Sequence, residues 1–236
     1  MVFDECYEEL RAYMGKYRAN SMQVDKNLSW PLGKRSSIVL TEDTAIELGH
    51  PQTDSAAFIL LTDDKNKVKD GQVTVIGPDL NETNQARLPF GKVIILAVDD
   101  YDHEQLFDRY AELDQVRHTA ILEGYMLRAV PQDMREWSRI SRQAVKRGIN
   151  FQKMASAIYD QYHAQPGVSA VETVFVTEGT EAVAGLKTIG TKVGRIVAAM
   201  NKMAFEMHFD CHGCEFEDVC EEVGELRKMR DAHKKA

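Results

Sequence analysis

Four cysteines placed at the two ends of the chain constrain its fold more than any other feature. Cys211, Cys214 and Cys220 fall within ten residues, whereas Cys6 lies near the N-terminus. Thiolates are soft ligands, so several of them close together form a site for zinc or an iron–sulfur cluster. If Cys6 folds back against the C-terminal tail, the four cysteines make a complete ligand set. The sequence therefore predicts that the two ends of the chain meet.

The composition indicates a globular protein with a hydrophobic core. Of 236 residues, 44% are hydrophobic and 28% are charged, which is ordinary for a globular domain. A formal net charge of −8 argues against non-specific binding of nucleic acid, because phosphates are repelled on average. The sequence has no apolar run of about 18 residues that would span a membrane, and it lacks the pattern of a signal peptide. We therefore expect a cytoplasmic protein whose cysteines are reduced or metal-bound.

Hydrophobic periodicity predicts strands mainly in the first half of the chain and helices in the second. The continuous apolar run at 56–62 predicts a strand covered on both faces. Further β-rich runs lie at 38–40, 73–76, 92–98 and 171–177. Helical spacing of apolar residues marks 3–14, 101–124, 133–147, 151–162, 183–204 and 221–235, whereas 15–36 is a turn-rich connector. We expect an α+β fold, with helices packed on a mixed β-sheet over 1–205 and a cysteine-bearing helical tail over 206–236.

A basic segment forms the second candidate site. Residues 133–147 begin with an aspartate that suits an N-cap and stop before a glycine, so we expect a helix there. On such a helix Arg135, Arg139 and Arg142 share one face. Three guanidinium groups could clamp a pyrophosphate or a 3′-phosphate, and Trp137 could stack on an adenine. The alternative is a solvated basic face paired with acids, with Trp137 in the core.

Four segments occur in an order that is familiar from a known family. Residues 43–53 read DTAIELGHPQT, and residues 68–79 read VKDGQVTVIGPD. The sequences LPFG at 88–91 and WSRISRQAV at 137–145 follow. Together these segments resemble the middle region of acetyl-CoA synthase, the beta subunit of the carbon monoxide dehydrogenase/acetyl-CoA synthase complex. The similarity runs from about Asp25 to the cysteine tail.

The resemblance implies an α+β domain followed by a catalytic domain that opens with four cysteines. In the family these cysteines hold a [4Fe–4S] cluster bridged to nickel. Cys211, Cys214 and Cys220 look like the first three, whereas the fourth would lie beyond the 16 residues that follow Cys220 here. Cys6 is our substitute for it. The Cys-Gly-Cys motif of the distal nickel is missing as well, so we expect no acetyl-CoA synthesis by this chain alone.

The resemblance also implies a coenzyme A site in the basic segment. Trp137 and Arg139 match family positions in a region linked to coenzyme A binding through an arginine-rich patch near a tryptophan. A second family tryptophan, nine residues earlier, is Arg128 here. His118 falls on a family histidine but is more typical of a structural residue. His50 lies in a turn and carries little signal.

Three functions of different classes are compatible with these patterns. The first is a binding or assembly module that carries a cluster and docks on carbon monoxide dehydrogenase, a corrinoid protein or a methyltransferase, or binds coenzyme A. The second is an enzyme subunit that contributes to acyl or electron transfer in anaerobic one-carbon metabolism. The third is a structural protein stabilised by zinc, for which His208 and His212 are alternative ligands. Iron and zinc content after anaerobic preparation separates them.

Overall fold

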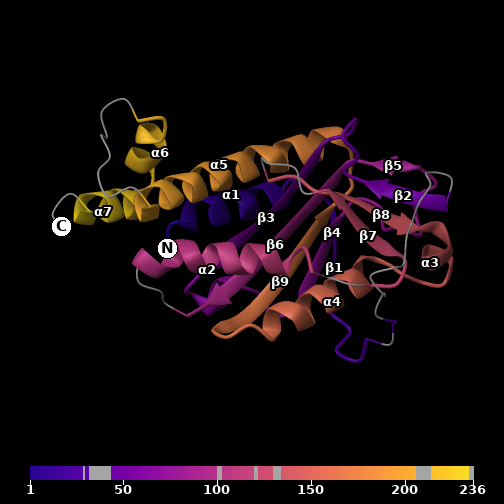
Figure 1. Cartoon of the computed structure of the whole chain (residues 1–236). Helices are drawn as coiled ribbons and strands as arrows, with labels where there is room; N and C mark the ends of the chain where they lie inside the picture. The colour runs from indigo at the N-terminus through magenta and orange to yellow at the C-terminus, as the bar shows by residue number, and fades with distance from the viewer. Residues whose placement is uncertain are drawn as a thin grey trace.

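The structure, a computed structural model, describes residues 1–28, 30–31, 44–99, 103–119, 122–129, 134–205 and 214–233. Within these ranges the chain forms two mixed β-sheets with helices packed against them (Figure 1). The predicted α+β class is therefore confirmed, although two sheets take the place of the expected one.

The larger sheet has five strands in the order β1–β4–β9–β6–β3. Their bounds are Ala19–Gln23 for β1, Gln72–Ile76 for β4, Val168–Val176 for β9, Phe90–Val98 for β6 and Ser55–Thr62 for β3. Strand β3 is parallel to β6, and β4 is parallel to β9, whereas β6–β9 and β1–β4 are antiparallel pairs. Every residue of β3 and β6 is buried, as expected for strands covered on both faces.

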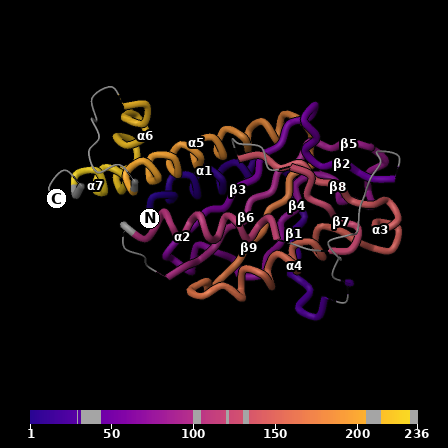
Figure 2. Tube along the Cα trace, viewed as in Figure 1, coloured from indigo at the N-terminus to yellow at the C-terminus, as the bar shows by residue number. Residues whose placement is uncertain are grey.

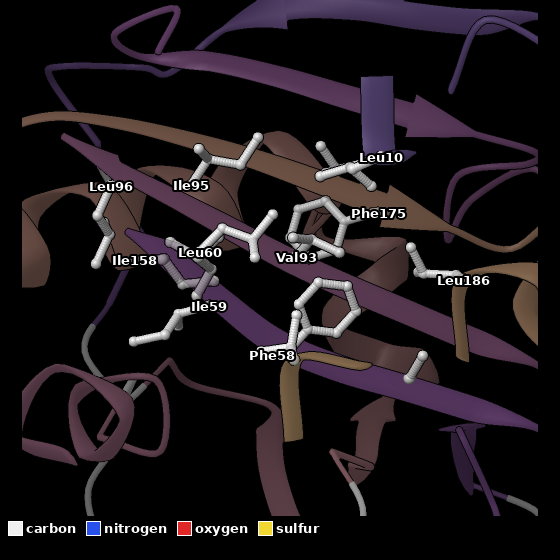
Figure 3. Packing of buried hydrophobic residues seen from close by; sticks show 14 of the residues in the cluster. Leu10, Phe58, Ile59, Leu60, Val93, Ile95, Leu96, Ile158, Phe175 and Leu186 are labelled. Carbon is white, nitrogen blue, oxygen red and sulfur yellow. The ribbon is translucent and has the colours of Figure 1, made fainter. Parts of the chain in front are cut away.

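Helices cover both faces of the larger sheet. The described helices are α1 (Asp4–Met14), α2 (His103–Val116), α3 (Arg142–Lys146), α4 (Phe151–His163), α5 (Thr180–Phe205), α6 (Glu217–Glu222) and α7 (Gly224–His233), with a 3-10 turn, η2, at Lys65–Lys67. On one face Phe58 packs against Gly190 of α5. On the other face Phe151 of α4 stacks on Phe175, with ring centroids 4.6 Å apart. Figure 3 shows Phe58, Phe175 and their aliphatic neighbours within this core.

The smaller sheet has the strand order β5–β2–β8–β7. Its strands are β5 (Arg87–Leu88), β2 (Ala45–Leu48), β8 (Trp137–Ser141) and β7 (Tyr125–Ala129). The antiparallel pairing of β2 with β8 places Glu47 opposite Arg139. The parallel pairing of β2 with β5 places Arg87 on the other side of Glu47. Pairing thus aligns one acid between two arginines.

The helix predicted over 133–147 is wrong for most of its length. Its first part is β8, in which burial alternates along the strand, so the period is two residues rather than 3.6. Backbone pairing with β2 and β7 on either side accounts for the strand. Only Arg142–Lys146 is helical, and Ser141 caps this short helix by accepting from the backbone N–H of Gln143.

Other boundaries also differ from the predictions. The connector predicted at 15–36 contains β1, and neither β2 nor β7 was expected. The helix predicted over 101–124 ends at Val116. The charged helix predicted over 221–235 starts earlier and is divided into α6 and α7. The β-rich run at 38–40 lies outside the described residues.

Both ends of the chain pack along α5. Helices α1, α6 and α7 all contact it, and Figure 2 shows them gathered beside it, with both termini on the same side of the molecule. Across the part of the chain that the structure describes, no helix is both long and apolar enough to cross a membrane. The division into a domain and a tail at residue 205 stays a prediction.

Candidate functional site

A cluster of basic side chains surrounds Trp137 on the smaller sheet. We call it the arginine–tryptophan cluster, and it comprises Glu47, His50, Arg87, Arg128, Arg135, Trp137 and Arg139. Glu47 is buried at its base, where the guanidinium of Arg139 forms an ion pair with its carboxylate. The Nε atom of Arg87 lies 3.5 Å from the other carboxylate oxygen. One carboxylate therefore anchors two of the four arginines.

Trp137 lies against three neighbouring side chains of the cluster. The guanidinium carbons of Arg128 and Arg139 are 5.3 and 5.6 Å from the centre of its ring, within cation–π range. The imidazole of His50 meets it edge-on, with ring centroids 5.2 Å apart. The indole N–H of Trp137 is buried and has no hydrogen-bond acceptor among the described residues. Guanidinium groups therefore lie over the ring of Trp137, and stacking of an adenine on this ring stays a prediction.

The four predicted coenzyme A residues are brought together only in part. Arg135, Trp137 and Arg139 are half-buried at alternate positions, so they share one face of an extended segment. Arg135 donates to the hydroxyl of Ser55 (3.2 Å) and the carbonyl of Thr53 (3.3 Å). Arg142 begins α3 instead, and donates to the backbone carbonyl of residue 85. The prediction that these residues share a helix face was wrong. Three of the four instead share one face of the extended segment that leads into β8.

A tight turn presents His50 to this cluster. Gly49 has a φ of +66°, and a Cβ atom there would lie 2.2 Å from the carbonyl oxygen of Glu136. The Nδ1 atom of His50 accepts from the N–H of Gln52 (3.1 Å), which leaves Nε2 facing Glu47 at 3.5 Å. Because only glycine fits this close approach, the turn fixes His50 beside Trp137.

A buried polar network lies beneath the cluster. Lys92 of β6 forms an ion pair with Glu136, and the two side chains are 2% and 0% exposed. The hydroxyl of Tyr125 donates to Glu136 at 3.2 Å. Burial lowers the pKa of Lys92, an effect that Glu136 opposes. Burial and then Arg117 also lower the pKa of His118, the histidine that the family resemblance singled out.

Two of the predicted metal-binding cysteines line one pocket. This small, open pocket lies between α5, α6 and α7, and its wall includes Cys214, Cys220, Lys202, Phe216 and Arg230. Neither cysteine is in a disulfide bond. Cys211 and the alternative ligands His208 and His212 lie outside the described residues.

Cys6 lies on the buried face of α1 and is fully buried. Burial, with the nearby carboxylate of Glu9 as the next cause, raises the pKa of its thiol to about 12. The amino group of Lys192 on α5 binds Glu5 and Glu9 of α1 and also Glu222 of α6, at 2.8–3.2 Å. Helix α1 and the C-terminal tail are therefore tied to the same point of α5.

Among the residues that the structure describes, no group of three or more His, Cys, Asp or Glu is placed to hold a metal ion. Because Cys211 belongs to none of the described ranges, this finding leaves the four-cysteine set untested. It remains a prediction.

Sequence reasoning missed several members of the arginine–tryptophan cluster. Glu47 and Arg87 carried no local signal, because strand pairing aligns them with Arg139, and Arg128 was noted only for standing where the family has a tryptophan. A signal for His50 did exist, since it lies in the family-like segment at 43–53 directly after a glycine. Alternating burial could also have been inferred at 135–140, where charged or aromatic residues mostly occupy odd positions.

The fold and the cluster together define an α+β domain with a basic, aromatic-centred face. A family described as the CO dehydrogenase/acetyl-CoA synthase complex beta subunit matches residues 35–184. The chain belongs to this family, as its sequence segments indicated.

Two relatives share part of the sequence. The acetyl-CoA decarbonylase/synthase complex subunit beta of Archaeoglobus fulgidus is 28% identical over 141 residues, which are 58% of this chain and 26% of that protein. The carbon monoxide dehydrogenase/acetyl-CoA synthase subunit alpha of Moorella thermoacetica is 30% identical over 110 residues, 46% of this chain and 14% of that protein. Both relatives extend well beyond the part that this chain matches.

Proposed function

We propose that this chain binds coenzyme A through the arginine–tryptophan cluster, as a binding domain of its family. The observation that carries the proposal is the pair of guanidinium groups, Arg128 and Arg139, over the ring of Trp137, with Arg135 on the same face and Arg87 sharing the carboxylate of Glu47 with Arg139. Guanidinium groups bind phosphates through paired hydrogen bonds, and coenzyme A carries a pyrophosphate and a 3′-phosphate.

The arginines divide into two roles. Arg87 and Arg139 share the carboxylate of Glu47 and shape the base of the cluster. Arg128 lies over the ring of Trp137, and Arg135 donates to neutral oxygens. Because neither of these two contacts involves a carboxylate, Arg128 and Arg135 are the groups we assign to the phosphates.

Calorimetric titration with coenzyme A tests this assignment. Arg128→Gln and Arg135→Gln should each weaken binding by about tenfold, which corresponds to roughly 1.4 kcal/mol. Arg227→Gln on α7 is the matched control and should bind like the wild type. Arg142→Gln should have a smaller effect than Arg135→Gln, because Arg142 begins α3. If the wild-type protein does not bind coenzyme A at millimolar concentration, the proposal is refuted.

We also propose that Cys211, Cys214 and Cys220 bind an iron–sulfur cluster, with zinc as the alternative metal. Support comes from the pocket that Cys214 and Cys220 share. Cys6 is our proposed fourth ligand because α1 and α6 are joined at Lys192. Its burial and high pKa oppose ligation, since a metal must displace the thiol proton. Cys6 therefore fits the metal less well than the two pocket cysteines.

Iron, sulfide and zinc analysis of anaerobically purified protein tests the metal site. Cys214→Ser and Cys220→Ser should each abolish metal binding. Retention of full metal content by Cys6→Ser would remove Cys6 from the ligand set while leaving the other three. Zinc without sulfide would support the structural alternative, and His212→Ala would then show whether a histidine completes a Cys₃His set. Metal-free protein from anaerobic cells would overturn the site.

The partners form the last part of the proposed function. The names of the family and of both relatives describe subunits of a complex, so we propose docking on carbon monoxide dehydrogenase, a corrinoid protein or a methyltransferase. Anaerobic size-exclusion chromatography of mixtures measures such docking by co-elution. Incubation with coenzyme A, a methyl donor and carbon monoxide tests the enzymatic alternative, for which we expect turnover only when a partner is present.

A further inference from the structure

We propose that the buried Lys92–Glu136 ion pair is a positioning device that holds the arginine–tryptophan cluster in its binding geometry. The inference rests on the proposed coenzyme A site and deepens it. Glu136 stands between Arg135 and Trp137 in the sequence, yet its side chain is fully buried while both neighbours are half-buried. Glu136 therefore fixes the backbone between Arg135 and Trp137, two members of the cluster.

The side chain of Glu136 joins the two sheets. Its Oε2 atom pairs with Lys92 on β6 of the larger sheet, and its Oε1 atom accepts from Tyr125 on β7 of the smaller sheet at 3.2 Å. Both partners are buried. Two directional contacts from two sheets fix the carboxylate and, with it, the backbone that carries Arg135 and Trp137.

The backbone beside Glu136 is fixed as well. The N–H of Ala57 on β3 donates to the carbonyl of Met134 at 2.6 Å. On the other side, the carbonyl of Glu136 lies against Gly49, where a Cβ atom would approach within 2.2 Å. The segment 134–136 thus runs from the edge strand β3 of the larger sheet into β8, and it is held at Met134 by Ala57 and at Glu136 by the close approach of Gly49.

Stability alone does not explain a buried pair at this place. Desolvation of two charges offsets most of their attraction, so an apolar pair of similar volume gives equal or greater stability. An apolar pair, however, lacks directional bonds and leaves the strand free to shift. A shift of this strand would move Arg135 and Trp137 relative to Arg128 on β7, and binding of a phosphate by both arginines depends on that arrangement.

The double variant Lys92→Met/Glu136→Leu separates position from stability. It is made in a Trp30→Phe background, in which Trp137 is the sole tryptophan. We expect an unchanged or higher unfolding midpoint, at least about tenfold weaker binding of coenzyme A, and stronger quenching of Trp137 fluorescence by acrylamide. The matched control is Arg11→Met/Glu172→Leu, which removes a buried pair between α1 and β9. It should leave coenzyme A affinity and acrylamide quenching of Trp137 unchanged.

Wild-type affinity and quenching in a stable double variant would overturn the inference. If that variant does not fold, Tyr125→Phe decides, because it removes one hydrogen bond to Glu136 and keeps the ring. We expect smaller changes of the same sign from it, and no change would again overturn the inference. If the background protein itself does not bind coenzyme A, the proposed function fails, whereas quenching of Trp137 still reports on its position.

Discussion

Replacement of Gly49 by alanine should lower the free energy of unfolding by about 2–5 kcal/mol. Gly49 has a φ of +66°, and this left-handed conformation costs a residue with a side chain roughly 1–2 kcal/mol. The new methyl group would lie 2.2 Å from the carbonyl oxygen of Glu136 and 2.7 Å from the Cβ of Ser55. Neither atom can rotate away, so the backbone must shift, at an overpacking cost of about 1–3 kcal/mol. The two costs add to the range given.

Urea unfolding followed by circular dichroism measures this loss. The matched control is Gly148→Ala, since Gly148 has a φ of +101° and its Cβ would meet only the flexible Lys153 amino group, at 3.5 Å. That variant should lose about 1–2 kcal/mol from conformation alone. Equal losses in the two variants would refute the contact with Glu136 as the cause. Coenzyme A affinity should fall in Gly49→Ala only, because His50 and Glu136 both border the turn.

Three further predictions address the buried ionisable groups. Burial raises the pKa of Asp79 above its ordinary 3.8, so the protonated carboxyl favours the folded state and stability falls as pH rises from about 4 through the folded-state pKa. Asp79→Asn should abolish this fall in the free energy of urea unfolding, and parallel pH profiles of the two proteins would contradict it. Arg11→Met should lower the free energy of unfolding by about 3–5 kcal/mol, because it leaves the buried carboxylate of Glu172 without the guanidinium that donates to both of its oxygens. Adding Glu172→Leu should bring the urea unfolding midpoint most of the way back to the wild-type value. Peptide mapping after iodoacetamide treatment at about pH 8 should show Cys6 alkylated more slowly than Cys214, since its pKa is about 12; faster labelling of Cys6 would be inconsistent with its burial.

Local pattern was sufficient to predict the strands and helices of the core. The run at 56–62 is apolar without interruption, and only a strand covered on both faces keeps all of it from water. The long helix at 183–204 repeats its apolar residues every three or four positions, and α5 buries that stripe against β3 and β6. In both cases the apolar residues that define the element lie within one continuous segment, so no distant partner is needed to predict it.

The basic segment was misjudged because its structure depends on a distant partner. Arg135, Arg139 and Arg142 suit a helix by spacing alone. Pairing with β2, about 90 residues earlier, selects the strand instead. The sequence of β2 conceals that pairing, since buried Glu47 interrupts its apolar pattern. An acid in a buried strand becomes understandable only once Arg139 and Arg87 lie on either side of it.

The same dependence explains how much of the site could be predicted. Arg135, Trp137 and Arg139 were found because they are near in sequence, whereas His50 and Arg128 reach Trp137 through the fold. The cysteine prediction is of another kind, because it requires the two ends of the chain to meet. The structure ties α1 and α6 to Lys192, and the assembly of all four sulfurs into one site stays a prediction because Cys211 lies outside the described residues.

The most family-like segment, at 68–79, serves as a structural joint. The carboxylate of Asp70 accepts from the N–H of Val171 at 3.1 Å, and that of Asp79 accepts from the N–H of Phe151 at the start of α4, also at 3.1 Å. A Cβ atom at Gly77 would lie 2.4 Å from the backbone nitrogen of Glu178. These residues join β4 to β9 and α4, so their role in this chain is structural. Likeness in this segment therefore specifies the fold, and chemistry must be tested at Trp137, where Arg128 replaces the tryptophan that the family resemblance led us to expect.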